Sequence, residues 1–225
     1  MNKLFQPRSV HILMEYVKLW YISGPRFDQV DIMQPEQLTL NRSQKRIIRA
    51  FTELLREKDY CDISVAMLIE RADVGKTTFY RYYQRKLEVL LAMHDDIFEL
   101  LLQDLTSKDD WLSNDARPSV SNMLNIFSNN SNFRRPMNFK LDKDWPQALL
   151  QLKAKLAHCM AVRLTFALDG CSIKIPISVL STSLAAIYVE SVIQLVKGLV
   201  TFSVNKQALY LQYLTRSLVI GAIES

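Results

Sequence analysis

The sequence predicts an all-α protein, and three observations support that prediction. The chain of 225 residues is 49% hydrophobic but has only 5 glycines and 7 prolines, so few breakers interrupt its apolar stretches. Apolar residues recur three and four positions apart over long segments, which is the period of an amphipathic helix. Alternating β-branched runs, which would indicate strands, are scarce. A chain of this length holds one large helical domain or two modest ones.

Residues 1–38 precede the first strong helical pattern. Residues 1–21 are apolar with scattered charges, and no small-residue cleavage site follows, so they do not have the pattern of a signal peptide. Residues 10–21 can form an amphipathic helix that ends at the Ser-Gly-Pro of residues 23–25. Two interpretations are open. Either this segment is a functional arm, or translation begins upstream of the native start, for which Met33 is the candidate.

The first helix of the main pattern is expected from Asn41 or Ser43 to about Lys58. Either residue can cap it, because the side-chain oxygen accepts a hydrogen bond from an early backbone amide. Apolar residues follow at helical spacing: Ile47, Ile48, Phe51, Leu54 and Leu55. Basic side chains gather on the outer face of the first half, and we expect Arg42 and Lys45 among them to contact phosphate.

Residues 64–86 predict two short helices joined by a tight turn. Ser64 is a good N-cap for the first, which has one apolar face. Residues 73–75, Asp-Val-Gly, form the turn, because Asp and Gly tolerate left-handed backbone. In the second helix Phe79 and Tyr83, four residues apart, face inward.

The opposite face of this second helix is basic, hydroxylic and aromatic. It is formed by Lys76, Thr77, Thr78, Tyr80 and Tyr82. A major groove admits an α-helix, and Lys, Thr and Tyr side chains hydrogen-bond to phosphates and base edges along it. The alternative is a face that is merely solvated. The pattern of the two helices therefore favours a helix-turn-helix motif that binds DNA.

A family resemblance strengthens this hypothesis. Residues 72–90 read A-D-V-G-K-T-T-F-Y-R-Y-Y-Q-R-K-L-E-V-L, which resembles the DNA-binding signature of the TetR family of transcriptional regulators. The resemblance covers roughly residues 43–90 without a gap. It implies a three-helix DNA-binding head, followed by a helical ligand-binding and dimerisation body. It also implies a phosphate contact for Lys86, and we include Ser64 in the DNA-binding set.

The chain departs from the family pattern at a few positions. Asp59 and Asp73 occupy positions where the family usually has Gly, and Asp adopts left-handed backbone less freely. Gly75 replaces the Ser that usually caps the recognition helix, so one side-chain cap is missing. Thr77 replaces a small residue, which bears on sequence preference.

The charge distribution favours a polyanionic partner for the head. Residues 39–90 carry 11 basic and 7 acidic side chains, against 4 and 4 in residues 1–38 and 13 and 12 in residues 91–225. Most of the net charge of +5 therefore lies in the candidate DNA-binding segment. Binding of DNA through such charges weakens as salt rises.

Several other classes of protein are disfavoured. The three cysteines, Cys61, Cys159 and Cys171, have no paired spacing, so we expect no disulfide framework and a reducing cytoplasm. The three histidines lie far apart, so no metal site or cofactor is expected. Nucleophile motifs and phosphate-binding glycine loops are missing, which argues against an enzyme. Apolar runs such as residues 192–204 are broken by Lys197 and are too short to span a bilayer, so no membrane segment is expected.

The body is expected to be a set of helices at residues 87–106, 120–127, 146–168, 176–202 and 205–223. Pro146 and Pro176 suit first-turn positions, and Asn205 can cap the last helix. Residues 109–118 are polar and turn-rich, and residues 128–144 are expected to be a loop whose Arg134-Arg135 pair could bind an anion but is more simply exposed.

The last two helices are apolar over more than one face, so they must be covered by their own domain and by a partner. We expect a homodimer through Leu184, Tyr188, Val192, Leu195, Leu211, Leu214 and Leu218. The family resemblance implies the same four-helix interface. Candidate residues for an effector pocket are Trp111, Met123, Phe127, Trp145, Met160 and Tyr188, although each such residue is more often simple core.

Together these observations predict three segments: an N-terminal extension (1–38), a helix-turn-helix DNA-binding domain (39–86) and a regulatory and dimerisation domain (87–225). The expected function is a cytoplasmic, dimeric regulator, more often a repressor, that binds a palindromic operator in double-stranded DNA under control of a small-molecule effector. The alternatives are an activator of the same fold and a helical protein-interaction module with a degenerate head. The chain has an R-R-P loop and a pair of terminal helices that begins at a proline. In these two features it is similar to regulators associated with dihydroxyacetone kinase.

Overall fold

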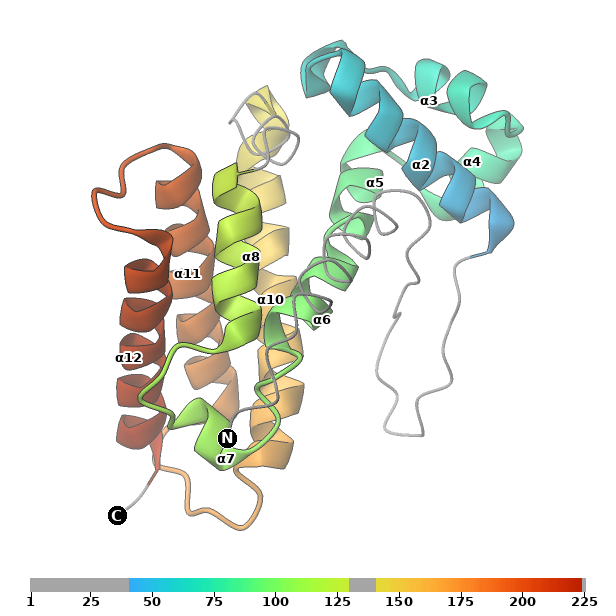
Figure 1. Cartoon of the computed structure of the whole chain (residues 1–225). Coiled ribbons are helices and arrows are strands. Elements are labelled where there is room, and N and C mark those ends of the chain that lie inside the picture. The colour runs from blue at the N-terminus through green and yellow to red at the C-terminus, as the bar shows by residue number, and fades with distance from the viewer. Residues whose placement is uncertain (1–40, 130–140, 224–225) are drawn as a thin grey trace, which may run out of the picture. The chain divides into compact units, whose positions relative to one another are not determined.

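The computed structural model describes residues 41–129 and 141–223, and these ranges are all-α, as predicted (Figure 1). They contain no strand; a single isolated antiparallel bridge joins Ile173 to Ile223. The chain divides into two compact units, one up to Asp96 and one from Ile97 onward. The expected extension of residues 1–38 and the Arg134-Arg135 pair lie outside the described residues. The domain boundary expected after residue 86 stays a prediction.

The first unit contains a short 3-10 turn, η1 (Tyr60–Asp62), and the helices α2 (Arg42–Glu57), α3 (Val65–Ala72), α4 (Lys76–Tyr82) and α5 (Lys86–Ala92). Helix α2 packs against the other three helices. Asn41, rather than Ser43, is its N-cap. The Asn41 Oδ1 accepts from the Gln44 amide at 3.0 Å, and the Gln44 Oε1 accepts from the Asn41 amide at 3.3 Å. This capping box fixes where α2 begins.

The core of this unit is formed by the residues that the helical spacing placed inward. Phe51, Leu68, Phe79 and Leu87 are fully buried, one from each of the four helices. At the surface, the Arg71 guanidinium of α3 donates to both carboxylate oxygens of Glu57 in α2, at 2.8 and 2.9 Å. These hydrogen bonds lower the pKa of Glu57 below its ordinary value. They also fix α3 against α2.

The turn between α3 and α4 depends on left-handed backbone at Asp73, with φ 47° and ψ 55°. The Asp73 amide donates to the Glu70 carbonyl at 3.0 Å, and the Val74 amide donates to the Ile69 carbonyl at 3.2 Å. This is the hydrogen-bond pattern that ends a helix at a left-handed residue. The Arg46 guanidinium also donates to the Asp73 carboxylate. Asp is therefore accepted here, as expected.

Asp59 is the other aspartate at a position where the family usually has Gly, and its backbone conformation carries no cost. Asp59 has φ −71° and ψ 152°, an extended conformation that any residue adopts. Gly75, the N-cap of α4, is also extended and makes no side-chain cap, as the sequence indicated.

The prediction of a single helix over residues 87–106 is wrong. Helix α5 ends at Ala92, and α6 runs over Asp95–Leu102. At the break, the backbone amide of His94 donates to the Leu91 carbonyl, three residues back, at 3.1 Å. The Leu90 carbonyl, which a continuing helix would pair with that amide, instead lies 2.8 Å from the His94 Nδ1. The side chain thus competes with the backbone for this acceptor.

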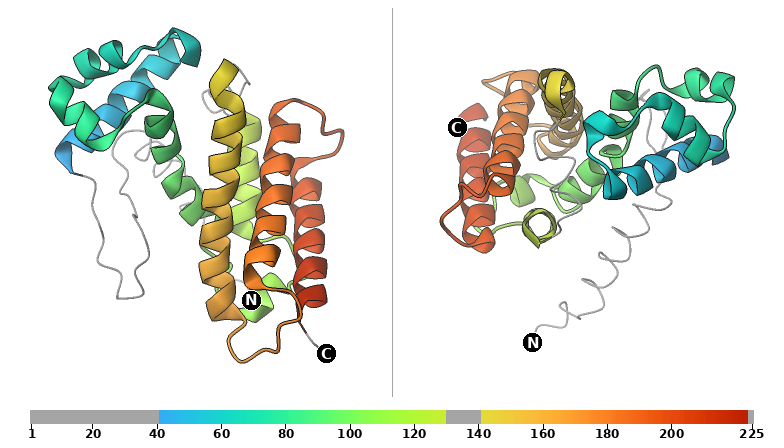
Figure 2. Two further views of the ribbon diagram at one scale, coloured as in Figure 1. Left: turned by 180° about the vertical axis from the view of Figure 1, so that it is seen from behind. Right: turned by 90° about the horizontal axis from the view of Figure 1, so that it is seen from above.

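The second unit is a bundle in which four helices run alongside one another (Figures 1 and 2). They are α8 (Pro118–Asn129), α10 (Trp145–Ala167), α11 (Ile177–Val196) and α12 (Val204–Ala222). Helix α11 ends six residues earlier than expected, because Gly198 adopts φ 70°. Ser203 caps α12, rather than Asn205, through a 3.4 Å hydrogen bond from the Lys206 amide.

A short helix, α7 (Lys108–Trp111), was not expected in the turn-rich segment. Ser107 caps it, and the Asp110 carboxylate accepts from the Ser107 and Thr106 amides at 2.9 and 3.2 Å. Burial raises the pKa of Asp110, but these and the hydroxyl hydrogen bonds outweigh it and leave the pKa lowered. The Ser-x-x-Asp spacing was the sequence signal for this helix.

Helix α11 is long and apolar enough to cross a membrane by length and composition alone. Half of its apolar stretch is buried inside the bundle, chiefly against α10 and α12. Core helices of soluble proteins have the same composition, so the sequence pattern of α11 is explained by its packing.

The Asp73 turn yields a stability prediction. Asp73→Val should lower the free energy of unfolding by about 1–2 kcal/mol, because a β-branched residue is strained at positive φ. Asp73→Gly should stay within about 0.5 kcal/mol of the parent, since the ion pair it loses is exposed and worth little. Urea unfolding of the full chain, followed by far-UV circular dichroism, measures both. Equal destabilisation by Val and Gly would contradict this account of the turn.

Candidate nucleic-acid interface

The outward face of α4 presents polar and aromatic side chains to solvent, as predicted. Lys76 and Thr77 are exposed, Tyr80 is 38% exposed, and Thr78 and Tyr82 are half-buried. On the opposite side Phe79 and Tyr83 are buried, at 0% and 2% exposure. The two faces of this seven-residue helix are therefore distinct in chemistry and in burial.

Tyr80 is both exposed and anchored. Its ring meets the buried Phe79 ring edge to face, with centroids 5.5 Å apart, and Phe79 in turn contacts Tyr83 at 6.0 Å. Edge-to-face aromatic pairs favour a defined ring orientation. The phenol of Tyr80 is thus held in place while its outer edge stays accessible to a ligand.

Arg81 is a candidate residue that the sequence reasoning missed. It is exposed and lines a shallow, open depression on the surface of α4 together with Lys76, Thr77 and Tyr80. The signal was its position four residues after Thr77, which places both side chains on one helical face. Arginine is the residue that most often recognises guanine in a major groove.

Two basic residues of α2 belong to the same end of the first unit. Arg42 is exposed and Lys45 is half-buried on the first turn of α2. One turn further, Arg46 donates to Asp73 in the turn that precedes α4. Because a helix rises about 1.5 Å per residue, Arg42 lies only about 6 Å along the axis from Arg46. The first turn of α2 therefore lies near the start of α4.

Pairing separates seven of the basic side chains of this unit into two groups. Arg49 donates to Glu53 at 3.0 Å, and Arg46 and Arg71 are bound to Asp73 and Glu57. By contrast, no carboxylate among the described residues pairs with a second group, which consists of Arg42, Lys45, Lys76 and Arg81. This unpaired group is available to neutralise phosphates.

Ser64 acts within the protein as the N-cap of α3. Its Oγ accepts a hydrogen bond from the Met67 amide at 3.2 Å, which is the role its position predicts. Its hydroxyl proton is not committed by that bond, so a DNA contact for Ser64 stays a prediction.

The structure does not display Lys86 as the phosphate contact that the family resemblance implied. Its Nζ donates to the carbonyl oxygens of Tyr60 at 2.6 Å, Ile63 at 2.8 Å and Cys61 at 3.4 Å. The same atom lies 4.1 Å from the centroid of the Tyr60 ring. An ammonium has three protons, so these carbonyls occupy its donor capacity.

The residues suggested for an effector pocket are spread through the core of the second unit. Trp111, Met123, Phe127, Met160 and Tyr188 are buried, and Trp145 is half-buried. They come from α7, α8, α10 and α11.

Tyr188 pairs with the Thr215 hydroxyl of α12 at 3.3 Å. Burial raises the pKa of Tyr188 to about 12, so its phenol stays neutral in the physiological range. A binding role for Tyr188 and the other core residues stays a prediction.

The residues expected at a dimer interface fall into two groups. Leu184, Tyr188, Leu195 and Leu211 are 7% exposed or less within a single chain, so they belong to the chain's own core. Apolar spacing does not reveal which face the same chain covers, and a role for these four residues at an interface stays a prediction. Val192 is half-buried. Leu214 and Leu218 are 52% and 37% exposed and remain candidates.

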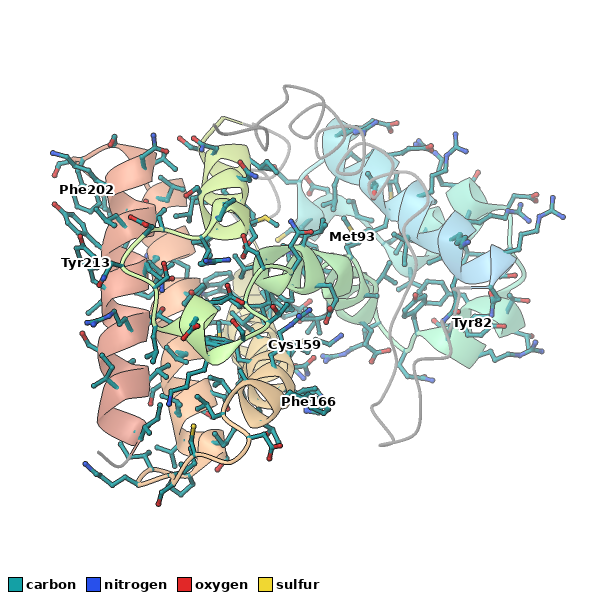
Figure 3. The ribbon with its side chains drawn as sticks, turned by 60° about the horizontal axis from the view of Figure 1, so that its bottom comes forward. Tyr82, Met93, Cys159, Phe166, Phe202 and Tyr213 are labelled. Atoms are coloured by element: carbon teal, nitrogen blue, oxygen red, sulfur yellow. The ribbon has the colours of Figure 1, made fainter. Side chains whose placement is uncertain are left out.

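An exposed stripe on α12 extends this second group. Its members, spaced three and four residues apart, are Tyr210, Tyr213, Leu214, Ser217, Leu218 and Gly221. Phe202 continues the stripe, with its ring 5.2 Å from that of Tyr210. Figure 3 shows Phe202 and Tyr213 on the outer side of α12, away from the other helices of the bundle. We refer to these residues as the α12 stripe.

Comparison with known proteins finds relatives of the first unit. The family model described as bacterial regulatory proteins, tetR family, matches residues 47–93, which include all of α3, α4 and α5 and most of α2. The HTH-type dhaKLM operon transcriptional activator DhaS of Lactococcus lactis subsp. lactis (strain IL1403) is 32% identical over 69 residues. That match spans 31% of this chain and 37% of the relative.

Two solved structures share the fold over most of the chain. A putative TetR-family transcriptional regulator from Syntrophomonas wolfei str. Goettingen aligns with a TM-score of 0.56 and 17% identity, over 80% of this chain and 95% of that chain. The TetR family repressor AlkX from Dietzia sp. strain DQ12-45-1b aligns with a TM-score of 0.53 and 12% identity, over 80% and 97%. At these identities the likeness shows the fold alone.

The two groups of basic residues yield a prediction about salt dependence. Lys76→Ala and Arg81→Ala should each weaken binding to duplex DNA and reduce the slope of log K against log salt by about 0.9, because each removes one phosphate neutralisation. Arg71→Ala is the matched control, since Arg71 is already paired with Glu57, and its slope should be unchanged. Fluorescence-anisotropy titrations at several salt concentrations measure the slopes. Equal slopes in all variants would exclude α4 from the interface.

Proposed function

We propose that this chain is a transcriptional regulator of the TetR family, whose family model matches residues 47–93, and that it binds double-stranded DNA through α4. The observation that carries the proposal is the unpaired group of basic residues beside the anchored Tyr80. A helix of seven residues that buries Phe79 and presents Lys76 and Arg81 suits a major groove. In this proposal residues 39–86 bind DNA and residues 87–225 regulate.

The proposed regulator is a homodimer that binds a palindromic operator. The α12 stripe supports this, because a helix face with two tyrosines and two leucines exposed at 37–52% invites a covering partner. A two-fold dimer would place two α4 helices on half-sites one helical turn, about 34–36 Å, apart or a multiple of it. Ser217 and Gly221 in the stripe would allow helices to approach closely.

Control by a small molecule is the remaining part of the proposal. A ligand in the second unit would shift the population between forms that do and do not fit the operator. The sign of regulation is open to either direction. The matched relative DhaS is named an activator, whereas the structural neighbour AlkX is named a repressor. The proposed location is the cytoplasm, where the DNA is.

The rival function is a helical interaction module whose head has lost DNA binding. The same surface discriminates between the two, since a protein-binding head has no need of unpaired Lys76 and Arg81 beside Tyr80. No second function is favoured by a specific observation.

The decisive experiment is binding of the purified chain to duplex DNA from the promoter of its own gene, against random duplex of equal length. Fluorescence anisotropy at two salt concentrations should show selective binding that weakens as salt rises. Tyr80→Ala should reduce the selective affinity about tenfold or more without changing the oligomeric state, since Tyr80 lies in α4. Affinity for both duplexes that is equal and feeble would favour the interaction module.

The α12 stripe yields a separate prediction. Leu214→Glu should raise the dissociation constant of the dimer about 100-fold or more, because an unpaired carboxylate would be buried in the interface. Sedimentation velocity at several protein concentrations measures it. Leu150→Glu is the matched control, since Leu150 is 68% exposed on α10, outside the stripe. Dissociation by both variants, or by neither, would contradict an interface at the α12 stripe.

A further inference from the structure

Lys86 joins the start of α5 to the segment that precedes α3. Its ammonium binds the carbonyls of Tyr60 and Ile63 at 2.6 and 2.8 Å, and that of Cys61 at 3.4 Å. These carbonyls belong to η1 and to the residue after it, and Ser64, the N-cap of α3, follows directly. One side chain thus fixes where α3 begins relative to α5.

The Tyr60 ring connects the Lys86 ammonium to the core of the first unit. The Tyr60 ring, 4.1 Å from the Lys86 Nζ, is 3% exposed and meets the buried Phe51 ring of α2 at 6.2 Å, edge to face. A cation held over the face of a partly desolvated aromatic ring is attracted by the negative charge of that face. The ammonium, the Tyr60 ring and Phe51 therefore form one continuous contact from α5 through η1 to α2.

The position of Lys86 in its own helix makes this contact necessary. Lys86 is the first residue of α5, where the helix dipole disfavours a positive charge. The carbonyl oxygens of Tyr60, Cys61 and Ile63 supply the negative partial charge that offsets this cost. A lysine that reached outward to phosphate would leave these carbonyls without the ammonium.

We propose that Lys86 is a positioning residue for DNA recognition, which holds α3 and hence α4 in their reading orientation without contacting phosphate. The proposal rests on the DNA-binding function proposed above. Only the turn at Asp73 separates α3 from α4. A displacement of the first residues of α3 would therefore also displace α4. Loss of the Lys86 hydrogen bonds should therefore lower the affinity for the operator sequence. The unpaired group of basic residues should still bind any duplex.

The experiment compares Lys86→Met and Lys86→Arg with Lys76→Met, using own-promoter and random duplexes in anisotropy titrations over a range of salt. Lys86→Met should lower selective affinity about tenfold, leave random-duplex affinity within twofold and leave the salt slope unchanged. Lys76→Met should reduce the slope by about 0.9, as expected of a phosphate contact. Lys86→Arg should fail like Lys86→Met, because a planar guanidinium cannot direct its protons to the same carbonyls as a compact ammonium.

Amide hydrogen exchange provides a second measurement that does not require DNA binding, so it also tests a variant that binds no DNA. In both Lys86 variants the amides of residues 60–68 should exchange faster, whereas in Lys76→Met they should not. A slope reduced by about 0.9 in Lys86→Met and restored in Lys86→Arg would overturn the proposal and make Lys86 a phosphate contact. An unchanged exchange rate would also overturn it. If the parent chain itself binds the own-promoter and random duplexes with equal, feeble affinity, the DNA-binding function fails, whatever the exchange rates at residues 60–68.

Discussion

Burial of Phe79 is the constraint on which the candidate interface depends. Helix α4 has only seven residues, too few to be stable alone, so its direction is set by what it buries. Phe79, fully buried and in contact with the rings of Tyr80 and Tyr83, supplies that anchor. Because residues three and four apart share a helical face, anchoring one residue orients the rest. The exposure of Lys76 and Arg81 therefore follows from the packing of a single ring.

Much of the first unit could be predicted from sequence, because its helices are amphipathic with one buried face. Helical spacing identified Phe51, Leu68 and Phe79 as core, and capping chemistry identified Ser64. The role of Lys86 could not be predicted. Its partners are backbone carbonyls some 23–26 residues earlier in the chain, and backbone oxygens are present at every position whatever the sequence. Only the fold brings these oxygens together.

The second unit was predicted less well, for a related physical reason. Helices α11 and α12 are apolar around much of their circumference, so the 3.6-residue period does not distinguish an inner from an outer face. Leu211 and Leu214 differ by three positions, yet one is 3% and the other 52% exposed. The break at His94 was also hidden, because neither Gly nor Pro marks it. A side chain that competes for a backbone acceptor has no fixed sequence signature.

The α12 helix is oriented by hydrogen bonds on its inner face rather than by apolar packing alone. The Gln212 amide donates to the Ser113 carbonyl at 3.0 Å, and the Arg216 Nε donates to the Leu112 carbonyl at 3.0 Å. Gln212 is 1% exposed. Rotation of α12 about its axis would leave buried polar groups unpaired, at a cost of about 1–3 kcal/mol each. These bonds to the end of α7 therefore fix which face of α12 points outward, and so hold the α12 stripe at the surface.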